Sequence, residues 1–195
     1  NIFSLSYCKF LVREVFKGFI EYELKPVVEF GVKTYKRVIK KINYYDVPYE
    51  VSFETEGIMI KFDGSYLSRI VDFEKDKHIL MRNVSLENYK INEEMILNSG
   101  LHAAEHAIIS MYPSEIICSR MELGGFSSVN AYGAPTIFIY ESVEGGVGYS
   151  EIAYSKMDKI VRRAFSTISN CSCNNDGGCP SCIQSPKCGN ANMIL

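Results

Sequence analysis

Five of the chain's seven cysteines lie between residues 171 and 188, near the C-terminus, and this cluster constrains the fold more than any other feature. The other residues of the segment are mostly Asn, Ser, Gly, Pro and Asp, which bury too little apolar surface to form a core. A tetrahedral zinc ion held by thiolates is the usual means of folding such a segment. The sequence therefore predicts a structural zinc site, because ligands that are all thiolates leave no open position for a substrate.

The spacing of the cysteines leaves two sets of zinc ligands open. Cys179 and Cys182 form a C-x-x-C turn, which is the commonest half of a zinc knuckle, and Cys171 and Cys173 form a tighter C-x-C pair. One possible quartet is therefore Cys171, Cys173, Cys179 and Cys182. The other consists of Cys173, Cys179, Cys182 and Cys188.

A disulfide framework and a redox-active C-x-x-C motif are the two competing interpretations of the cluster. Disulfides belong to oxidising compartments, yet no secretory signal is recognisable here and the cluster has an odd number of cysteines. A redox motif normally opens a helix after a strand, whereas Gly178 and Pro180 surround this one. We therefore favour zinc and expect a reducing, cytoplasmic location. Cys8 and Cys118 lie in apolar contexts and are expected to be small core residues.

The size and charge of the chain restrict its function only broadly. Its 195 residues suffice for one large domain or two small ones. No apolar run approaches the ~18 residues of a membrane span, so no membrane partner is expected. The net charge of -2 does not by itself indicate a nucleic-acid-binding protein. The chain begins without an initiator Met, and we expect it to be a fragment of a longer protein.

The hydrophobic pattern predicts an α+β fold in which a strand-rich N-terminal half precedes a layer of strands and helices closed by the four-cysteine zinc knot. Residues 1–90 form the strand-rich segment, with strands up to about residue 62, breaks at Gly18 and Pro26, and a turn at Gly57 or Gly64. Residues 91–195 form the zinc-binding domain. There the pattern predicts helices at 92–111 and 149–169 and strands at 116–123 and 135–141.

His102, Glu105 and His106 match the H-x-x-E-H pattern of one class of zinc hydrolases. In such an enzyme the two histidines bind zinc and Glu105 acts as the general base. The mechanism also needs a third protein ligand, usually a Glu well downstream, and few acidic residues follow the motif here. A zinc-dependent hydrolase is therefore the alternative function. The favoured interpretation is a packed helix that shows its His-Glu-His edge to solvent or to a partner.

Basic residues gather at two places. Lys156, Lys159 and Arg163 share the outer face of the helix at 149–169, which leads into the cysteine cluster and Lys187. A basic helix beside a rigid metal knot is a common way of contacting a nucleic-acid backbone, so these four residues are predicted to bind nucleic acid; a solvated face is the alternative. The basic stretch 33–41, with its neighbouring tyrosines, fits either nucleic-acid binding or a solvated sheet edge.

The glycine-rich loop at 145–148 lies between a predicted strand and a predicted helix, where backbone N–H groups can hold a phosphate. A tight strand-to-helix turn explains the loop as well. The loop matches neither G-x-G-x-x-G nor the Walker A pattern. No Walker A pattern occurs anywhere in the chain, so ATP hydrolysis by the P-loop route is not expected.

Three motifs occur in a fixed order. They are Gly100-Leu101-His102-Ala103-Ala104-Glu105-His106-Ala107, then Ile137-Phe138-Ile139-Tyr140 running into Glu144-Gly145-Gly146-Val147-Gly148, and finally the cysteine segment with Cys179-Pro180-Ser181-Cys182 and Cys188-Gly189-Asn190. Together these motifs resemble the C-terminal zinc-binding (MZB) domain of MrfA-like superfamily 2 DNA helicases, over about residues 90–195. One departure is Glu122-Leu123-Gly124-Gly125, where the family pattern has Asp-Leu-Gly-Gly.

The resemblance implies a C-terminal accessory domain of an ATP-dependent DNA helicase that acts in DNA repair. Its partners would be DNA and the motor domains of the same polypeptide. It also implies a structural Zn²⁺ at Cys171, Cys173, Cys179 and Cys182, with Cys188 as a fifth candidate. The motor domains are absent from this sequence, so no catalytic residue is assigned, and the chain alone is not expected to hydrolyse ATP or unwind DNA.

Overall fold

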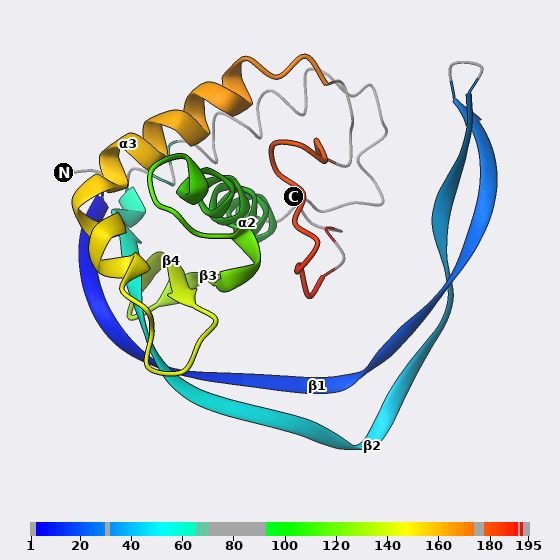
Figure 1. The fold of residues 1–195 in the computed structure, drawn as a ribbon, viewed down its shortest axis with the longest axis horizontal. Helices are drawn as coiled ribbons and strands as arrows, with labels where there is room; N and C mark the ends of the chain where they lie inside the picture. The colour runs from blue at the N-terminus through cyan, green and yellow to red at the C-terminus, as the bar shows by residue number, and fades with distance from the viewer. Residues whose placement is uncertain are drawn as a thin grey trace. The chain divides into compact units, whose positions relative to one another are not determined.

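The computed structural model describes residues 3–29, 32–65, 67, 69, 93–173, 178–190 and 192. Two long strands, β1 (Phe3–Glu29) and β2 (Val32–Phe62), come first (Figure 1). The later elements are α2 (Glu93–Met111), the short 3-10 helices η2 (Tyr112–Ser114) and η3 (Arg120–Glu122), β3 (Leu123–Ala131), β4 (Ala134–Glu141) and α3 (Tyr149–Ser169). The strands form one sheet in the order β1-β2-β4-β3, which confirms the predicted α+β class.

The internal contacts divide the chain into two units. The core unit comprises Asn1–Phe10 and Glu54–Leu195, and the ribbon unit comprises Leu11–Phe53. Both β1 and β2 therefore contribute residues to each unit. The predicted boundary at residue 90 lies outside the described residues.

The ribbon unit is built from the continuous middle parts of β1 and β2, so the predicted breaks at Gly18 and Pro26 are wrong. Proline is tolerated because β1 lies at the edge of the sheet, beside β2 alone among the described strands. Gly18 is required by a close approach of backbones, since a Cβ atom there would lie 2.9 Å from the Cα of Tyr44. Aromatic rings also pair within this unit, with centroids 5.9 Å apart for Phe16 and Tyr49.

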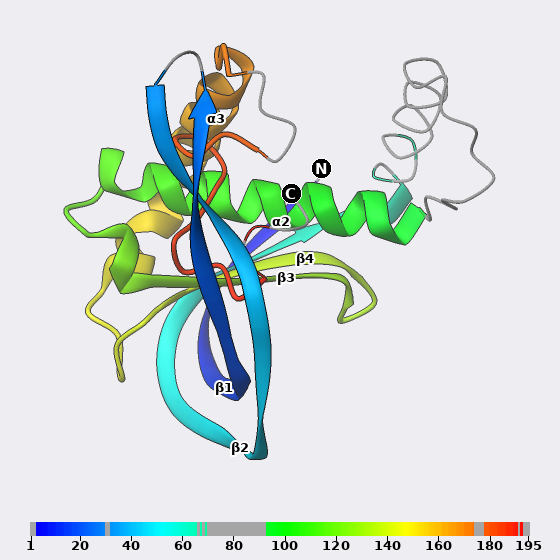
Figure 2. The same cartoon turned by 90° about the vertical axis from the view of Figure 1, so that its right-hand side faces the viewer.

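In the core unit, the end of β2 pairs antiparallel with β4, and β4 pairs antiparallel with β3. Gly57 lies opposite Tyr140 within this ladder, so Gly57 is wrong as a turn position. The other predicted position, Gly64, follows the end of β2 at Phe62. Helix α2 packs on β3 and β4 and also contacts α3 (Figure 2). The core lies between these layers, and its fully buried members include Ile58, Tyr112, Ile137, Ile139, Met157 and Ile160.

The predicted helices and the second predicted strand are confirmed as α2, α3 and β4, with boundaries that differ by at most one residue. The strand predicted at 116–123 is wrong, because β3 begins only at Leu123. A capping box precedes it instead, in which Glu122 accepts the N–H of Ser119 at 2.6 Å. Glu122 also accepts the hydroxyl of Tyr149 at 3.2 Å, so the glutamate that departs from the family pattern links η3 to α3.

None of the helices that the structure describes is long and apolar enough to cross a membrane.

Candidate metal centre

The C-terminal segment brings three thiols together directly after α3. The sulfur atoms of Cys171, Cys179 and Cys182 all lie within 4.8 Å of one another. Cys171 follows the end of α3, where its N–H donates to the carbonyl of Ile168 at 3.1 Å. Cys179 opens a tight turn, because its carbonyl accepts the N–H groups of Cys182, Ile183 and Gln184. The C-x-x-C spacing thus places its two sulfur atoms on the same side of one turn.

The acid–base properties of these thiols fit a cation bound among them. The backbone N–H of Ser181 lowers the pKa of the Cys179 thiol to about 7. The pKa of Cys182 is raised to about 12, first by its hydrogen bond with Cys171 and second by its burial. Thiolates this close repel one another, so they cannot all ionise without a counter-charge. A divalent ion supplies that charge, and sulfur ligands suit Zn²⁺.

The remaining cysteines lie elsewhere. Cys173 is exposed and lies outside the group of three, next to residues 174–177, which are not among the described residues. The structure therefore brings together three of the four predicted ligands, and the role of Cys173 stays a prediction. All seven cysteines lie among the described residues and all have free thiols, so the structure contains none of the disulfides of the competing interpretation.

Cys188 belongs to a second group, which it forms with His102 and His106 of α2. Its sulfur lies 3.5 Å from Nε2 of His102, and the centroids of the two imidazole rings are 4.4 Å apart. Nδ1 of His106 donates to the carbonyl of Ile183 at 2.9 Å. No sequence pattern joined these histidines to this cysteine, so their meeting was not predicted. The i, i+4 spacing of the histidines and an unassigned fifth cysteine were the signals that could have joined them.

The prediction that α2 shows its His-Glu-His edge to solvent or to a partner is wrong for Glu105 and His106, while His102 is partly exposed. Glu105, His106 and Ser110 are all buried, with 5%, 4% and 8% of their surfaces exposed. The C-terminal segment covers His106, while Glu105 hydrogen-bonds Ser127 of β3. Gly125 leaves the space for this carboxylate, because a Cβ atom there would lie 2.7 Å from Cδ of Glu105. A general base must reach a water molecule, and Glu105 faces the sheet instead.

Burial changes the acidity of both residues. It raises the pKa of Glu105 to about 7, although the hydrogen bond from Ser127 opposes the shift. The pKa of His106 is lowered to about 4, mainly by burial and to a smaller extent by the charge of His102. His106 is therefore neutral at physiological pH and keeps a lone pair on Nε2, since Nδ1 carries the proton donated to Ile183.

The raised pKa of Glu105 predicts a pH dependence of stability. Folded Glu105 keeps its proton up to about pH 7, whereas the unfolded chain releases it near the ordinary glutamate pKa of 4.5. The stabilisation is therefore complete below pH 4.5 and is lost as the pH rises through 7. Relative to Glu105→Gln, we expect the wild type to lose about 2 kcal/mol of unfolding free energy between pH 5.5 and 8. Urea denaturation of both proteins measures the difference, and parallel pH curves would contradict the prediction.

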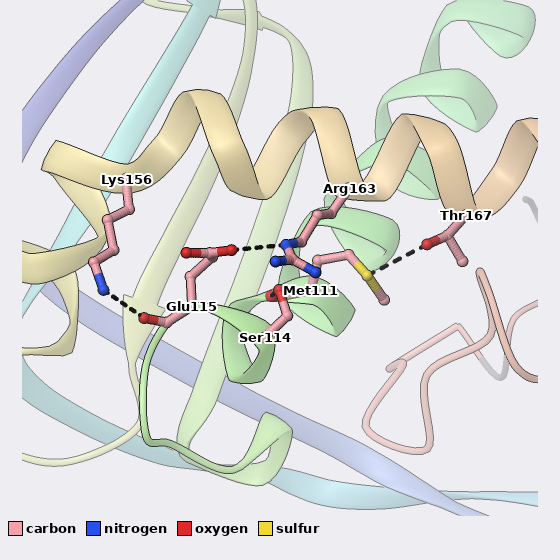
Figure 3. Close-up of polar contacts among 6 residues, drawn as sticks. All are labelled: Met111, Ser114, Glu115, Lys156, Arg163 and Thr167. Carbon is pink, nitrogen blue, oxygen red and sulfur yellow. Dashed lines mark hydrogen bonds and ion pairs between the residues drawn. The ribbon is translucent and has the colours of Figure 1, made fainter.

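Three of the four predicted nucleic-acid-binding cations make contacts within the core unit. Nζ of Lys156 donates to the carbonyl of Glu115 at 2.7 Å, and Nε of Arg163 donates to the carboxylate of the same residue at 2.7 Å (Figure 3). Nζ of Lys187 donates to the carbonyls of Met121 and Leu123, each at 3.0 Å.

These contacts give the three cations a structural role. Lys156 and Arg163 fasten α3 to the turn after η2, and Lys187 fastens the C-terminal segment to the start of β3. Lys159 is exposed on α3, as Arg163 and Lys187 are, but its side chain makes no such contact with the described residues. DNA contact by all four stays a prediction.

The glycine-rich loop before α3 holds a carboxylate of the chain itself. Glu141, the last residue of β4, has none of its surface exposed. Its side chain accepts the backbone N–H groups of Val147 and Ser150, the latter at 2.7 Å. Gly148 before the helix has a φ of 89°, which favours glycine. The N-terminus of α3 thus already binds an anionic group, so the tight turn describes this loop better than a phosphate site does.

The fold and the thiol cluster define a small α+β domain with a structural metal site made of cysteines. A family model described as "MZB: MrfA Zn-binding domain" matches residues 104–183. "Uncharacterized protein MJ1572.1" of Methanocaldococcus jannaschii is 38% identical over 100 residues, which cover 49% of this chain and 88% of that protein. The chain therefore belongs to the MrfA Zn-binding domain family, whose domain binds zinc.

Two further relatives are much longer than this chain. "Uncharacterized ATP-dependent helicase YprA" of Bacillus subtilis is 33% identical over 92 residues, 46% of this chain but only 12% of YprA. "ATP-dependent helicase hrq1" of Schizosaccharomyces pombe is 29% identical over 101 residues, again 46% of this chain and 10% of the helicase. A crystal structure of the DUF1998 helicase MrfA bound to DNA has a similar fold, with a TM-score of 0.51 and 19% identity; the match covers 96% of this chain and 24% of MrfA.

Proposed function

We propose that the chain is the C-terminal accessory domain of an ATP-dependent DNA helicase, where it supports the motor domains and contacts DNA. The observation that carries the proposal is the thiol cluster directly after α3, in a chain that corresponds to only 12% and 10% of two helicase relatives. A metal-stabilised unit of this size adds a rigid surface to motor domains and has no need of a catalytic site of its own. We place the parent protein in cytoplasmic DNA repair, as the family resemblance implies.

DNA contact has two candidate surfaces. The first is the outer face of α3, where Lys159 is exposed. The second is the ribbon unit, where Lys33, Lys40 and Lys41 are exposed and where the exposed fraction of Tyr44 is 75%. Basic side chains interleaved with aromatic rings suit a nucleic-acid strand, because the charges meet phosphates while the rings stack on bases. The internal contacts of Lys156, Arg163 and Lys187 favour the ribbon unit as the stronger of the two surfaces.

Fluorescence anisotropy with labelled single-stranded DNA tests the contact. We expect the isolated chain to bind, and its affinity to fall as salt rises, because bound phosphates release counterions. The double variant Lys40→Glu, Lys41→Glu should weaken binding about tenfold or more at low salt and flatten the salt dependence. Lys159→Glu is the matched charge reversal on α3, and it should weaken binding less.

The outcomes separate the proposal from its alternatives. If the wild type and both variants bind DNA equally well, neither the ribbon unit nor the outer face of α3 is the DNA-binding surface. Absent or salt-insensitive binding by the wild type would leave a protein-interaction module that docks on the motor domains and does not touch DNA. Peptide hydrolysis that depends on zinc and is lost in Glu105→Gln would instead establish the hydrolase.

A further inference from the structure

We infer that the chain binds a second zinc ion through His102, His106 and Cys188, at a site separate from the three-thiol cluster. The three residues come from two elements that are distant in sequence, since the histidines lie on successive turns of α2 and Cys188 lies in the C-terminal segment. Their ligand atoms all lie within 4.8 Å of one another.

The distances fit tetrahedral coordination. Zinc bonds of about 2.0 Å to nitrogen and about 2.3 Å to sulfur place a tetrahedral nitrogen–sulfur pair about 3.5 Å apart. The observed separation of Cys188 Sγ from His102 Nε2 is 3.5 Å. The two imidazole rings, with centroids 4.4 Å apart and planes inclined by 64°, approach one another edge to face and are not stacked. Two imidazoles and a thiolate form a donor set that suits zinc.

Neighbouring groups form hydrogen bonds that orient two of these ligands, His106 and Cys188, as groups around a metal site usually do. The carbonyl of Ile183 can only accept, so Nδ1 of His106 carries a proton and Nε2 is left for the metal. The backbone N–H of Asn192 donates to the sulfur of Cys188 at 3.3 Å, which fixes the position of that sulfur. Asn192 is itself fixed, because its side-chain amide bonds both the N–H and the carbonyl of Ser185 at 2.9 Å.

The site has a structural role. Ile183 follows the C-x-x-C turn directly, and Cys188 lies five residues further on, so an ion here would fasten the end of the chain to α2. Three protein ligands leave a fourth position, which water occupies at such sites. That water would lack a general base from this helix, because the carboxylate of Glu105 is buried against β3. The two ions therefore have separate structural roles. The first links the end of α3 to the C-x-x-C turn, and the second links the residues after that turn to α2.

Zinc analysis of the untagged chain tests the inference. Native mass spectrometry of the wild type should find two zinc ions per chain, and Cys188→Ser should retain one. Cys118→Ser is the matched control, since Cys118 is a partly buried thiol outside both groups, and it should retain two. One zinc ion in the wild type, or an unchanged count in Cys188→Ser, would overturn the inference.

A measurement on the wild type covers the case in which Cys188→Ser does not fold. X-ray absorption at the zinc edge should show imidazole nitrogen as well as sulfur around zinc, because the thiolate cluster alone contributes only sulfur. A shell of sulfur alone would overturn the inference. His102→Gln provides a third check, since it should also reduce the count from two zinc ions to one while leaving every cysteine in place.

Discussion

Replacing Cys182 by serine is expected to release zinc from the three-thiol cluster and to unfold the segment that follows α3. Cys182 is the most buried of the three thiols, with 7% of its surface exposed, and its sulfur lies close to both of the others. The apparent binding energy of a structural zinc ion is roughly 10 kcal/mol or more, and for a segment with so little core it is also folding energy. Zinc content and protease resistance of residues beyond 170 are the measurements.

The matched control is Cys118→Ser, which removes a thiol outside the cluster. It should keep its zinc and its protease resistance. Treating the wild type with a strong chelator removes the zinc of both sites, so it should unfold the C-terminal segment at least as fully as Cys182→Ser does, and adding zinc should reverse the effect. A Cys182→Ser protein with full zinc content and an intact C-terminal segment would show that these thiols are not the ligands.

Replacing Glu141 by alanine is expected to lower the free energy of unfolding by about 4 kcal/mol. The carboxylate is fully buried and accepts two backbone N–H groups at the start of α3. The alanine variant leaves both donors without their partner, removes a favourable charge at the helix N-terminus and creates a cavity. Thermal or urea denaturation measures the loss.

Two variants sharpen this experiment. Glu141→Gln keeps the size of the side chain but can accept only through one oxygen, so it should lose about half as much stability. Glu144→Ala removes an exposed glutamate three residues further on and should change stability by less than about 0.5 kcal/mol. If Glu141→Ala and Glu144→Ala are equally stable, the carboxylate does not hold the start of α3.

The sequence predicted α2, β4 and α3 well, because their signals are local, whereas β3 lies further along the chain than the predicted strand. Pro113 ends the pattern of α2, and the apolar run 135–141 has the continuous hydrophobicity of a buried strand. The buried residues of α3, among them Ala153, Met157, Ile160 and Ala164, recur at helical spacing. Local turns also explain why Cys179 and Cys182 could be paired from their spacing alone.

The strands of the first half were predicted less well, because whether a Gly or Pro interrupts a strand depends on the strands beside it. Pro26 does not end β1, which is an edge strand, and Gly18 is needed where the backbone of β2 comes close. The sequence pattern predicts breaks at both residues, because a sequence shows neither which strand is at an edge nor where two backbones approach.

What the sequence by itself determined is the zinc-binding C-terminus, the α+β class and the order of the elements in the second half. Hydrophobic periodicity and cysteine spacing act over a few residues, so they can be recognised without a partner. Only the tertiary structure decided that Cys188 meets the histidines of α2, that Glu105 faces β3, and that Glu141 caps α3. Each of these contacts joins groups whose meeting depends on how helices, strands and turns pack, and no local pattern encodes that packing.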